Sequence, residues 1–368
     1  MSDPRSKKQA DILVNYSTEV RPGEWVVILA EDLVAEPLVN DIAEKVLQAG
    51  GYPTAYFTSE RILETALRTG SEEQLSWPVP LRRFIASQAN VLITVWAARN
   101  TRFKGGVAGS KVRAERAGQR EFLEAYSQRV ASGELRWAGT QFPCDAFALE
   151  ADMNLHDYED FAYSAMHADQ EDPVSHWRQV HSGQQRLVDW LKGKKEVVVH
   201  SPSAELRLSI AGRTFINGDG KKNMPCGEIF TSPVEDSVNG WVEFSFPAVY
   251  LGREVEGVRL EFEDGKVTQA TARKNEDYLH QMLDSDDNAR YLGEFAFGTN
   301  TSIQRFTKSI LFDEKIGGTI HLAVGRGFAE AGGKNFSTLH WDMICDMRQQ
   351  SEVLVDGELF YKDGKFQV

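Results

Sequence analysis

Short apolar runs alternate with segments of helical periodicity along the first half of the chain, and this alternation limits the possible folds. Residues 25–30 and 90–96 have the length and composition of buried strands. Residues 37–51 lie between them and have apolar side chains at helical spacing, ending on Gly50-Gly51. A repeated strand, helix, strand order forms parallel strands joined by right-handed crossovers. The pattern therefore predicts an N-terminal α/β domain with a largely parallel sheet.

The second half of the chain has a different pattern of expected helices and strands. One or two helices are expected over residues 158–191, with an interruption near Asp172-Pro173, and a strong strand follows at 196–200. Short alternating strands come next, and Glu263-Asp264-Gly265 is a hairpin turn between two of them. A chain of 368 residues is too long for one ordinary core. We therefore expect two domains, an N-terminal α/β domain over residues 1–190 and a C-terminal mixed α+β domain over residues 191–368.

The first half lacks the usual nucleotide signatures. No glycine follows the first strand in Leu29-Ala30-Glu31-Asp32-Leu33, so a dinucleotide cofactor is not indicated. The segment 104–111 is basic and rich in glycine, but it does not match the phosphate-binding P-loop. An ordinary loop is the favoured interpretation of this segment.

Charge and composition exclude several partners. The net charge of −13 opposes binding to nucleic acid and to anionic membranes. No run of about 18 apolar residues occurs and the N-terminus has no apolar signal core, so no membrane association is expected. Three cysteines that are far apart suit a reducing compartment, and we expect a cytoplasmic protein.

Five good metal ligands occur in the C-terminal half, each in a setting rich in Gly, Ser or Thr that reads as a loop or strand end. They are Glu228, Glu294, His321, His340 and Asp342. Taken singly, each has a structural explanation: a surface turn for each glutamate, a core hydrogen bond for His321 and a polar strand face for the last pair. In a strand, alternation would nevertheless point His340 and Asp342 to one face and Trp341 to the other.

The donor types in this set indicate a particular metal chemistry. Carboxylates suit Mg²⁺ and Mn²⁺, imidazole suits Zn²⁺ and Co²⁺, and a mixed set fits either group. Three carboxylates and two histidines exceed what one tetrahedral ion needs. The excess indicates two divalent ions per chain that share a bridging carboxylate.

Several segments together resemble the aminopeptidase T family of metallopeptidases, which includes the AmpS- and PepS-type aminopeptidases. They include residues 16–24, 135–143 and 153–163, the segments around the five ligands, and Asp313-Glu314-Lys315-Ile316. The resemblance implies a dimeric, cytoplasmic, two-domain exopeptidase that removes N-terminal residues from peptides with a free N-terminus. It also implies that all five ligands hold paired divalent ions in the C-terminal domain.

Two further residues enter through this resemblance. The family usually has a tyrosine seven residues after its first ligand histidine, and this chain has Phe328 there. If that hydroxyl steadies the tetrahedral intermediate, its loss can cost about 10²-fold in turnover. Glu314 is the candidate general base, and a salt bridge with Lys315 is the alternative role.

Two other functions stay open from the sequence. Pyridine-ring-opening iron dioxygenases resemble the family distantly, and His321, His340 and Asp342 could supply their two-histidine, one-carboxylate Fe(II) site. The retention of Glu228 and Glu294 favours the hydrolase. A catalytically impaired metal-binding homologue is the third hypothesis, and Phe328 motivates it.

Overall fold

The computed structural model describes residues 3–368, which form two compact units. The first comprises the described residues up to Trp177 together with Gly220–Pro225, and the second comprises Arg178–Asp219 with Cys226–Val368. The division falls inside one helix, α10 (Pro173–Leu191). The predicted domain boundary near residue 190 lies at the end of this helix.

The first unit is built on a parallel sheet, whose strand order is β2-β1-β3-β4-β8. Its strands are β1 (Trp25–Ala30), β2 (Tyr52–Phe57), β3 (Val91–Trp96), β4 (Arg136–Gln141) and β8 (Asn223–Met224). Its helical segments are α1 (Pro4–Ile12), η1 (Leu13–Ser17), η2 (Leu33–Ala35), α2 (Glu36–Gln48), α3 (Glu60–Thr69), α4 (Glu72–Ser76), α5 (Pro80–Gln88), α6 (Gly109–Gly118), α7 (Arg120–Ala131), α8 (Asp145–Glu150) and α9 (Leu155–Ala165).

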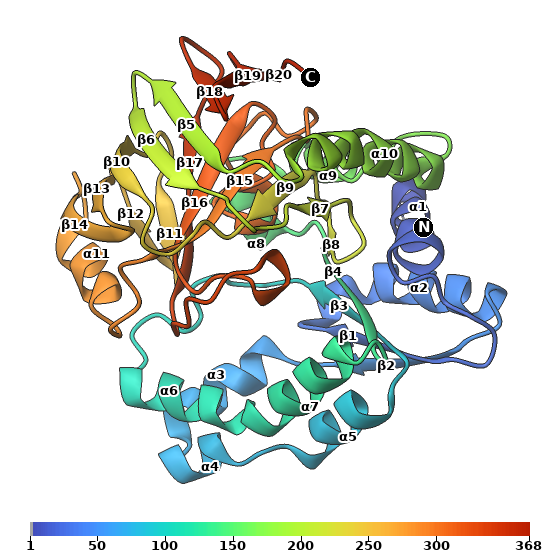
Figure 1. The fold of residues 1–368 in the computed structure, drawn as a ribbon. Helices are drawn as coiled ribbons and strands as arrows, with labels where there is room; N and C mark the ends of the chain where they lie inside the picture. Colours follow the sequence, from blue (N-terminus) through green and yellow to red (C-terminus); the bar gives the residue numbers. More distant parts are fainter. Residues whose placement is uncertain (1–2) are drawn as a thin grey trace. The chain divides into compact units, whose positions relative to one another are not determined.

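Helices cover both faces of this sheet (Figure 1). Helices α5 and α7 pack on one face, where Ile85 meets Val27 and Leu92 in a small apolar core. Helix α2 packs against β1 from the other face and contacts α1. The sheet is therefore buried on both faces, as parallel sheets usually are. The prediction of an N-terminal α/β domain with a parallel sheet is confirmed.

The second unit consists mainly of antiparallel strands in three sheets. The order of the largest is β14-β13-β10-β6-β5-β18-β19-β20, that of the next is β17-β16-β15-β9-β7, and β11 pairs with β12. The large sheet comprises β5 (Glu196–Ser201), β6 (Ala204–Ser209), β10 (Asn239–Glu243), β13 (Arg259–Glu263), β14 (Lys266–Thr271), β18 (Glu352–Val355), β19 (Glu358–Lys362) and β20 (Lys365–Phe366). The other elements are β7 (Ile216–Gly218), β9 (Glu228–Thr231), β11 (Ala248–Tyr250), β12 (Arg253–Val255), β15 (Leu292–Gly298), β16 (Thr319–Gly325), β17 (His340–Asp346), α11 (Glu276–Leu283), α12 (Ile310–Asp313) and η3 (Ala329–Ala331).

One apolar core lies between the large sheet and the five-stranded sheet. Val199 and Leu206 of the large sheet contribute to it, and so do Phe297, Leu322 and Trp341 of the five-stranded sheet. Each of these strands therefore has one face fixed by hydrophobic burial. Helices are few in this unit, so the prediction of a mixed, largely β C-terminal domain is also confirmed.

The described part of the chain, residues 3–368, contains no helix that is long and apolar enough to cross a bilayer.

Candidate metal centre

The candidate ligands lie within the five-stranded sheet, on the face opposite the apolar core. In β16, Ile320 and Leu322 enter the core, so His321 between them points to the other face. In β17, Trp341 enters the core, so His340 and Asp342 on either side of it point to the opposite face. Hydrophobic alternation along these two neighbouring strands therefore gathers His321, His340 and Asp342 on one face.

A β-bulge aims Glu294 at this face. Leu292 pairs with Val324 and Glu294 with Ala323, so the register shifts by one residue at Gly293. Without the shift, Leu292 and Glu294 would share a face; with it, Leu292 enters the core and Glu294 turns away from it. A Cβ on Gly293 would collide with the carbonyl oxygens of Gly325 and Arg326. The bulge therefore depends on glycine.

Small residues stand beside every ligand across the strands. The pairs are Glu228 with Gly298, Glu294 with Ala323, His321 with Ala296, Asp342 with Ala323 and His340 with Gly325. Neighbouring strands lie about 5 Å apart, so a large side chain at these positions would fill the space between the donors. The sequence patterns Gly-Glu-Phe-Ala-Phe-Gly and His-Leu-Ala-Val-Gly carry this signal, which the sequence analysis missed.

The first group of donors is deeply buried. It comprises Glu228, Glu294 and His321, each with a donor atom within 4.8 Å of the others. Nε2 of His321 lies 3.3 Å from Oε2 of Glu228 and 3.6 Å from Oε1 of Glu294. Two carboxylates and an imidazole around one point are a suitable ligand set for a divalent cation.

The second group shares one member with the first. It comprises Glu294, His340 and Asp342. Nε2 of His340 lies 3.2 Å from Oε2 of Glu294 and 3.5 Å from Oδ1 of Asp342. Nδ1 of His340 lies 2.8 Å from the carbonyl oxygen of Arg326, which can only accept a hydrogen bond. The proton of the neutral ring is therefore on Nδ1, and Nε2 is free to bind a metal.

Several donor atoms lack a protein partner. Within residues 3–368, Oε2 of Glu228, both ring nitrogens of His321 and Oδ1 of Asp342 are buried without a hydrogen bond. Buried polar atoms are rarely left unsatisfied. Divalent cations would satisfy Oε2 of Glu228, Oδ1 of Asp342 and one ring nitrogen of His321, so the residues present fit the metal that the resemblance implies.

The charges of the site shift the titration of both histidines. Burial opposes the charged form of His321, but the carboxylates around it, Glu294 first, raise its pKa above the usual value. Burial also opposes protonation of His340, yet Asp342 and Glu294 raise its pKa well above the usual value. The pKa of Asp342 is lowered, because the neighbouring histidines and Lys315 outweigh its burial. The face of the five-stranded sheet that carries these residues therefore has an excess of negative charge, and this charge attracts cations.

Lys315 is a member of the site that the sequence analysis did not predict as functional. Its side chain is fully buried, its Nζ lies 3.3 Å from Oε1 of Glu228, and it forms a close ion pair with Glu314. Glu314 itself forms a third group of possible ligands with His321 and Asp342. The salt bridge considered from the sequence is thus present, and it lies among the donors.

Phe328 covers one side of His340. The two rings meet edge to face with their centroids 5.1 Å apart, and Phe230 lies 5.0 Å from Phe328 on another side. The backbone N–H of Phe328 donates to Oγ of Ser232. The Phe328 ring therefore contacts one member of the second donor group.

One local expectation was wrong. Glu294 and His321 lie inside strands rather than in loops or at strand ends, because glycine and alanine here make room on a sheet face. Gly227, which precedes Glu228, makes room for a neighbouring protein segment, since a Cβ there would lie 2.7 Å from Cβ of Asn300.

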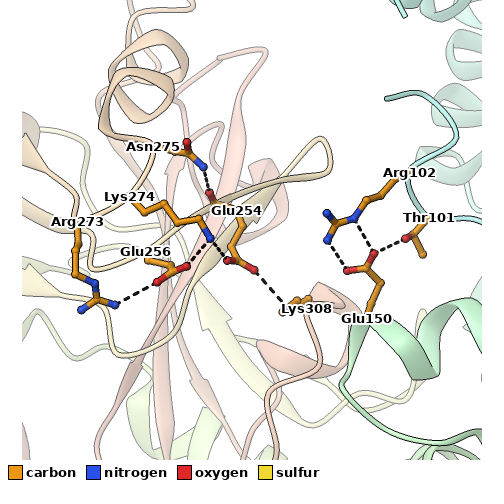
Figure 2. A network of polar contacts seen from close by, with 9 residues as sticks. All are labelled: Thr101, Arg102, Glu150, Glu254, Glu256, Arg273, Lys274, Asn275 and Lys308. Carbon is orange, nitrogen blue, oxygen red and sulfur yellow. Dashed lines mark hydrogen bonds and ion pairs between the residues drawn. The ribbon is translucent and has the colours of Figure 1, made fainter. Parts of the chain in front are cut away.

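A cavity of about 180 Å³ opens beside Asp342. Val249, Phe306 and Ile344 give it apolar walls, and Lys308 lies at its edge. Figure 2 shows Lys308 facing Glu254, at 3.7 Å, and Glu254 also binds Lys274 at 2.9 Å. These ion pairs fix the loop that forms one wall of the cavity.

The chain matches the family described as thermophilic metalloprotease (M29) over residues 2–366. It is 26% identical to Aminopeptidase 2 of Geobacillus stearothermophilus over 398 aligned positions, which cover 97% of this chain and 94% of that protein. The chain therefore belongs to the M29 family of thermophilic metalloproteases, which confirms the resemblance found in the sequence and the prediction of a peptide-bond hydrolase.

Solved structures share the fold. Wild-type AmpT from Thermus thermophilus aligns with a TM-score of 0.86 at 22% identity, covering 99% of both chains. The 2,5-dihydroxypyridine dioxygenase of Pseudomonas putida KT2440 aligns with a TM-score of 0.59 at 13% identity, covering 100% of this chain and 98% of that one. At such identities the likeness shows the fold alone.

Proposed function

We propose that the protein is a metal-dependent aminopeptidase that binds two divalent ions through Glu228, Glu294, His321, His340 and Asp342. One observation carries the proposal: Glu294 belongs to both donor groups, with one oxygen directed at His321 and the other at His340. A shared carboxylate is the usual bridge between two ions. Zn²⁺, Co²⁺, Mn²⁺ and Mg²⁺ all tolerate this ligand set.

Bound ions would supply an activated water and polarise the scissile carbonyl. The side chains of this chain supply the proton transfers and the anchoring. Glu314 is the proposed general base, which accepts the proton of the water and passes it to the leaving amine. Its neighbour Lys315 offers a cation that favours the ionised carboxylate, the state that a base needs.

The substrate is proposed to be a peptide with a free N-terminus. The free α-amino group of the peptide would be anchored beside the metal centre, which would restrict cleavage to the first residue. The cavity beside Asp342 has apolar walls and about 180 Å³ of space, so an aliphatic side chain of the N-terminal residue fits it. A homodimer in the cytoplasm is carried over from the family resemblance as part of the same proposal.

The other two hypotheses have less support. A single Fe(II) ion held by His321, His340 and Asp342 would leave Glu228 and Glu294 buried without a role. An impaired homologue rests on Phe328, whose ring lacks the hydroxyl that the family usually places there.

Metal stoichiometry measured together with peptide turnover tests the proposal. We expect two divalent ions per chain and release of N-terminal amino acids from a panel of unblocked peptides, with none from the same peptides after N-terminal acetylation. One iron per chain with oxygen uptake would support the dioxygenase. If the protein binds metal but hydrolyses no peptide in the presence of Zn²⁺, Co²⁺, Mn²⁺ or Mg²⁺, the result would support the hypothesis of a catalytically impaired homologue.

A further inference from the structure

A second cavity lies wholly within the first unit, at the carboxyl ends of its central strands. Its volume is about 480 Å³, and its walls include Leu29 near the end of β1, Glu31 after β1, Thr58 after β2 and Ala97 after β3. The chain passes from β1 to β2 on one side and then crosses to β3 on the other side of β1. Open α/β sheets bind ligands at such a topological switch point. The volume is within the range of small-molecule sites.

The three carboxylates of this cavity have different partners. Glu115 forms an ion pair with Lys104 at 3.3 Å. Glu60 forms no ion pair within residues 3–368, and it accepts hydrogen bonds from the backbone N–H groups of Arg99 and Asn100 at 2.8 and 3.2 Å. Glu31 lines the cavity, is exposed, and has no ion pair within 4.0 Å among the described residues; its carboxylate accepts a hydrogen bond from the backbone N–H of Ala97. Glu31 is therefore accessible to a cationic group of a ligand.

The neighbouring side chains partly desolvate the carboxylate of Glu31, although the residue as a whole is exposed. This partial burial raises the pKa of Glu31 to about 7, and Lys104, the backbone N–H of Ala97 and Arg82 act in the opposite direction. A ligand cation at this position would replace the missing counter-charge.

The same cavity has groups that suit an anion and an apolar side chain. Arg82 on α5 and Lys104 on the loop after β3 bring positive charge to its wall. Phe103, Phe122 and Phe147 form its apolar surface. Charges of both signs beside an aromatic wall match a molecule that carries an ammonium, a carboxylate and an apolar group.

The loop after β3 that carries Phe103 and Lys104 is anchored rather than free. Glu150, the last residue of α8, accepts hydrogen bonds from Oγ1 of Thr101 at 2.6 Å and from Nε and Nη2 of Arg102 at 3.0 and 3.1 Å (Figure 2). A cavity wall held in this way is partly formed before a ligand arrives, which reduces the entropic cost of binding.

We propose that this cavity binds a free α-amino acid with an apolar side chain. Its ammonium would pair with Glu31, its carboxylate with Arg82 and Lys104, and its side chain would contact the three phenylalanines. A nucleotide is a poorer match, because the carboxylates outnumber the cations and no glycine-rich loop follows β1. The inference goes beyond the proposed function, since the cavity shares no residue with the metal centre.

Calorimetric titration of the metal-loaded protein with L-leucine tests the proposal. We expect binding that Glu31→Gln weakens at least tenfold, since a charge-assisted hydrogen bond is lost. The control variant Glu36→Gln removes an exposed carboxylate of α2 outside the cavity and should bind leucine normally. Equal affinity in Glu31→Gln and in the wild type would overturn the proposal.

The metal centre is a second place where leucine could bind, so the titration is repeated in Glu294→Gln. Binding should persist there and should disappear when Glu31→Gln is added. Peptide turnover in Glu31→Gln should stay within twofold of the wild type. Calorimetry measures leucine binding without peptide turnover. The titration therefore tests this cavity even if the protein proves not to be an aminopeptidase. Loss of leucine binding in Glu294→Gln alone would assign the site to the metal centre instead.

Two analogues and a proton measurement test the contacts. Leucinamide lacks the carboxylate and 4-methylpentanoate lacks the ammonium, so each should bind at least tenfold more weakly than leucine. Binding of the ammonium should also displace the proton of Glu31, with release of about half a proton per leucine at pH 7. Titration in buffers of different ionisation enthalpy measures this release. Proton release on leucine binding to the Glu31→Gln variant would contradict the contact assigned to Glu31. Equal affinity of the wild type for leucinamide and for leucine would contradict the contact assigned to the carboxylate.

Discussion

The two units use their sheets differently to present chemical groups. In the first unit Glu31, Thr58 and Asn100 of the cavity follow the carboxyl ends of β1, β2 and β3, outside the sheet. In the second unit Glu294 and His321 project from the middle of β15 and β16. A parallel sheet covered by helices on both faces has only its strand ends free. An antiparallel sheet with one face on the core can place ligands along the other face.

This difference also sets how precisely each site is built. Donors on neighbouring strands are fixed by the register of the sheet, and small residues beside them set the space that remains. Groups at strand ends depend on loops, such as the loop held by Glu150 in the first unit. We therefore expect the metal centre to be sensitive to single methyl groups, and the cavity to be sensitive mainly to charge.

The largest expected effect comes from Glu294→Gln, which removes the carboxylate shared by both donor groups. Peptide turnover should fall by about 10³-fold or more, because loss of the bridge disturbs both proposed ions. Metal content by mass spectrometry should fall below two per chain while circular dichroism stays unchanged. The exposed Glu263→Gln serves as the control. Full activity in Glu294→Gln would remove this residue from the site.

Gly293→Ala tests whether the sheet register builds the centre. The added methyl group meets the carbonyl oxygens of Gly325 and Arg326, so the free energy of unfolding should fall by about 2–3 kcal/mol. Metal affinity should fall as well, because Glu294 is displaced from its position.

Gly183→Ala on α10 is the matched control, since a Cβ there meets no atom within 4 Å. It should leave stability unchanged or raise it by up to about 1 kcal/mol. Chemical denaturation measures both variants. Unchanged metal affinity in Gly293→Ala would show that the bulge does not position Glu294.

Phe328→Tyr adds the hydroxyl that the family usually carries beside the second donor group. We expect kcat to rise by about threefold to tenfold, which corresponds to one hydrogen bond gained in the transition state. KM should change little. Steady-state kinetics on one unblocked peptide measure both constants, and equal kcat values would mean that the missing hydroxyl does not limit turnover.

Glu31→Gln gives the smallest effect, on the stability of the empty protein. The folded pKa of Glu31 is about 7, above that of an exposed glutamate, so the wild type loses stability as pH rises from about 4.5 to 7. Glutamine does not ionise, so the Glu31→Gln variant does not lose stability from this position as the pH rises. It should be more stable than the wild type at pH 8 by about 1 kcal/mol, because cavity water screens the charge, and equally stable at pH 4.

Thermal unfolding at the two pH values measures the difference. A glutamine variant that gains nothing at pH 8 would show that water solvates Glu31 fully.

Local sequence patterns determined much of the fold. The apolar run 25–30 is strand β1 with the predicted bounds, and the predicted strand 196–200 is β5 within one residue. The hairpin at Glu263-Asp264-Gly265 also joins two strands as predicted. Helices α3, α4 and α6 were not predicted. Helix α4 is short and the apolar periodicity of α6 is weak, whereas the apolar residues of α3 have a clear helical spacing that the prediction overlooked.

The sequence by itself determined which elements form and which residue types are available, since periodicity and turn chemistry act over a few neighbouring residues. It also supplied the family, through motifs that run over most of the chain. The tertiary structure alone decided that Glu228 and Asp342, more than a hundred positions apart, share one sheet face, and that Lys315 is buried among them. It also left Glu31 without an ion pair at a strand end. Strand order, register and burial depend on packing between distant segments, and no local pattern encodes them.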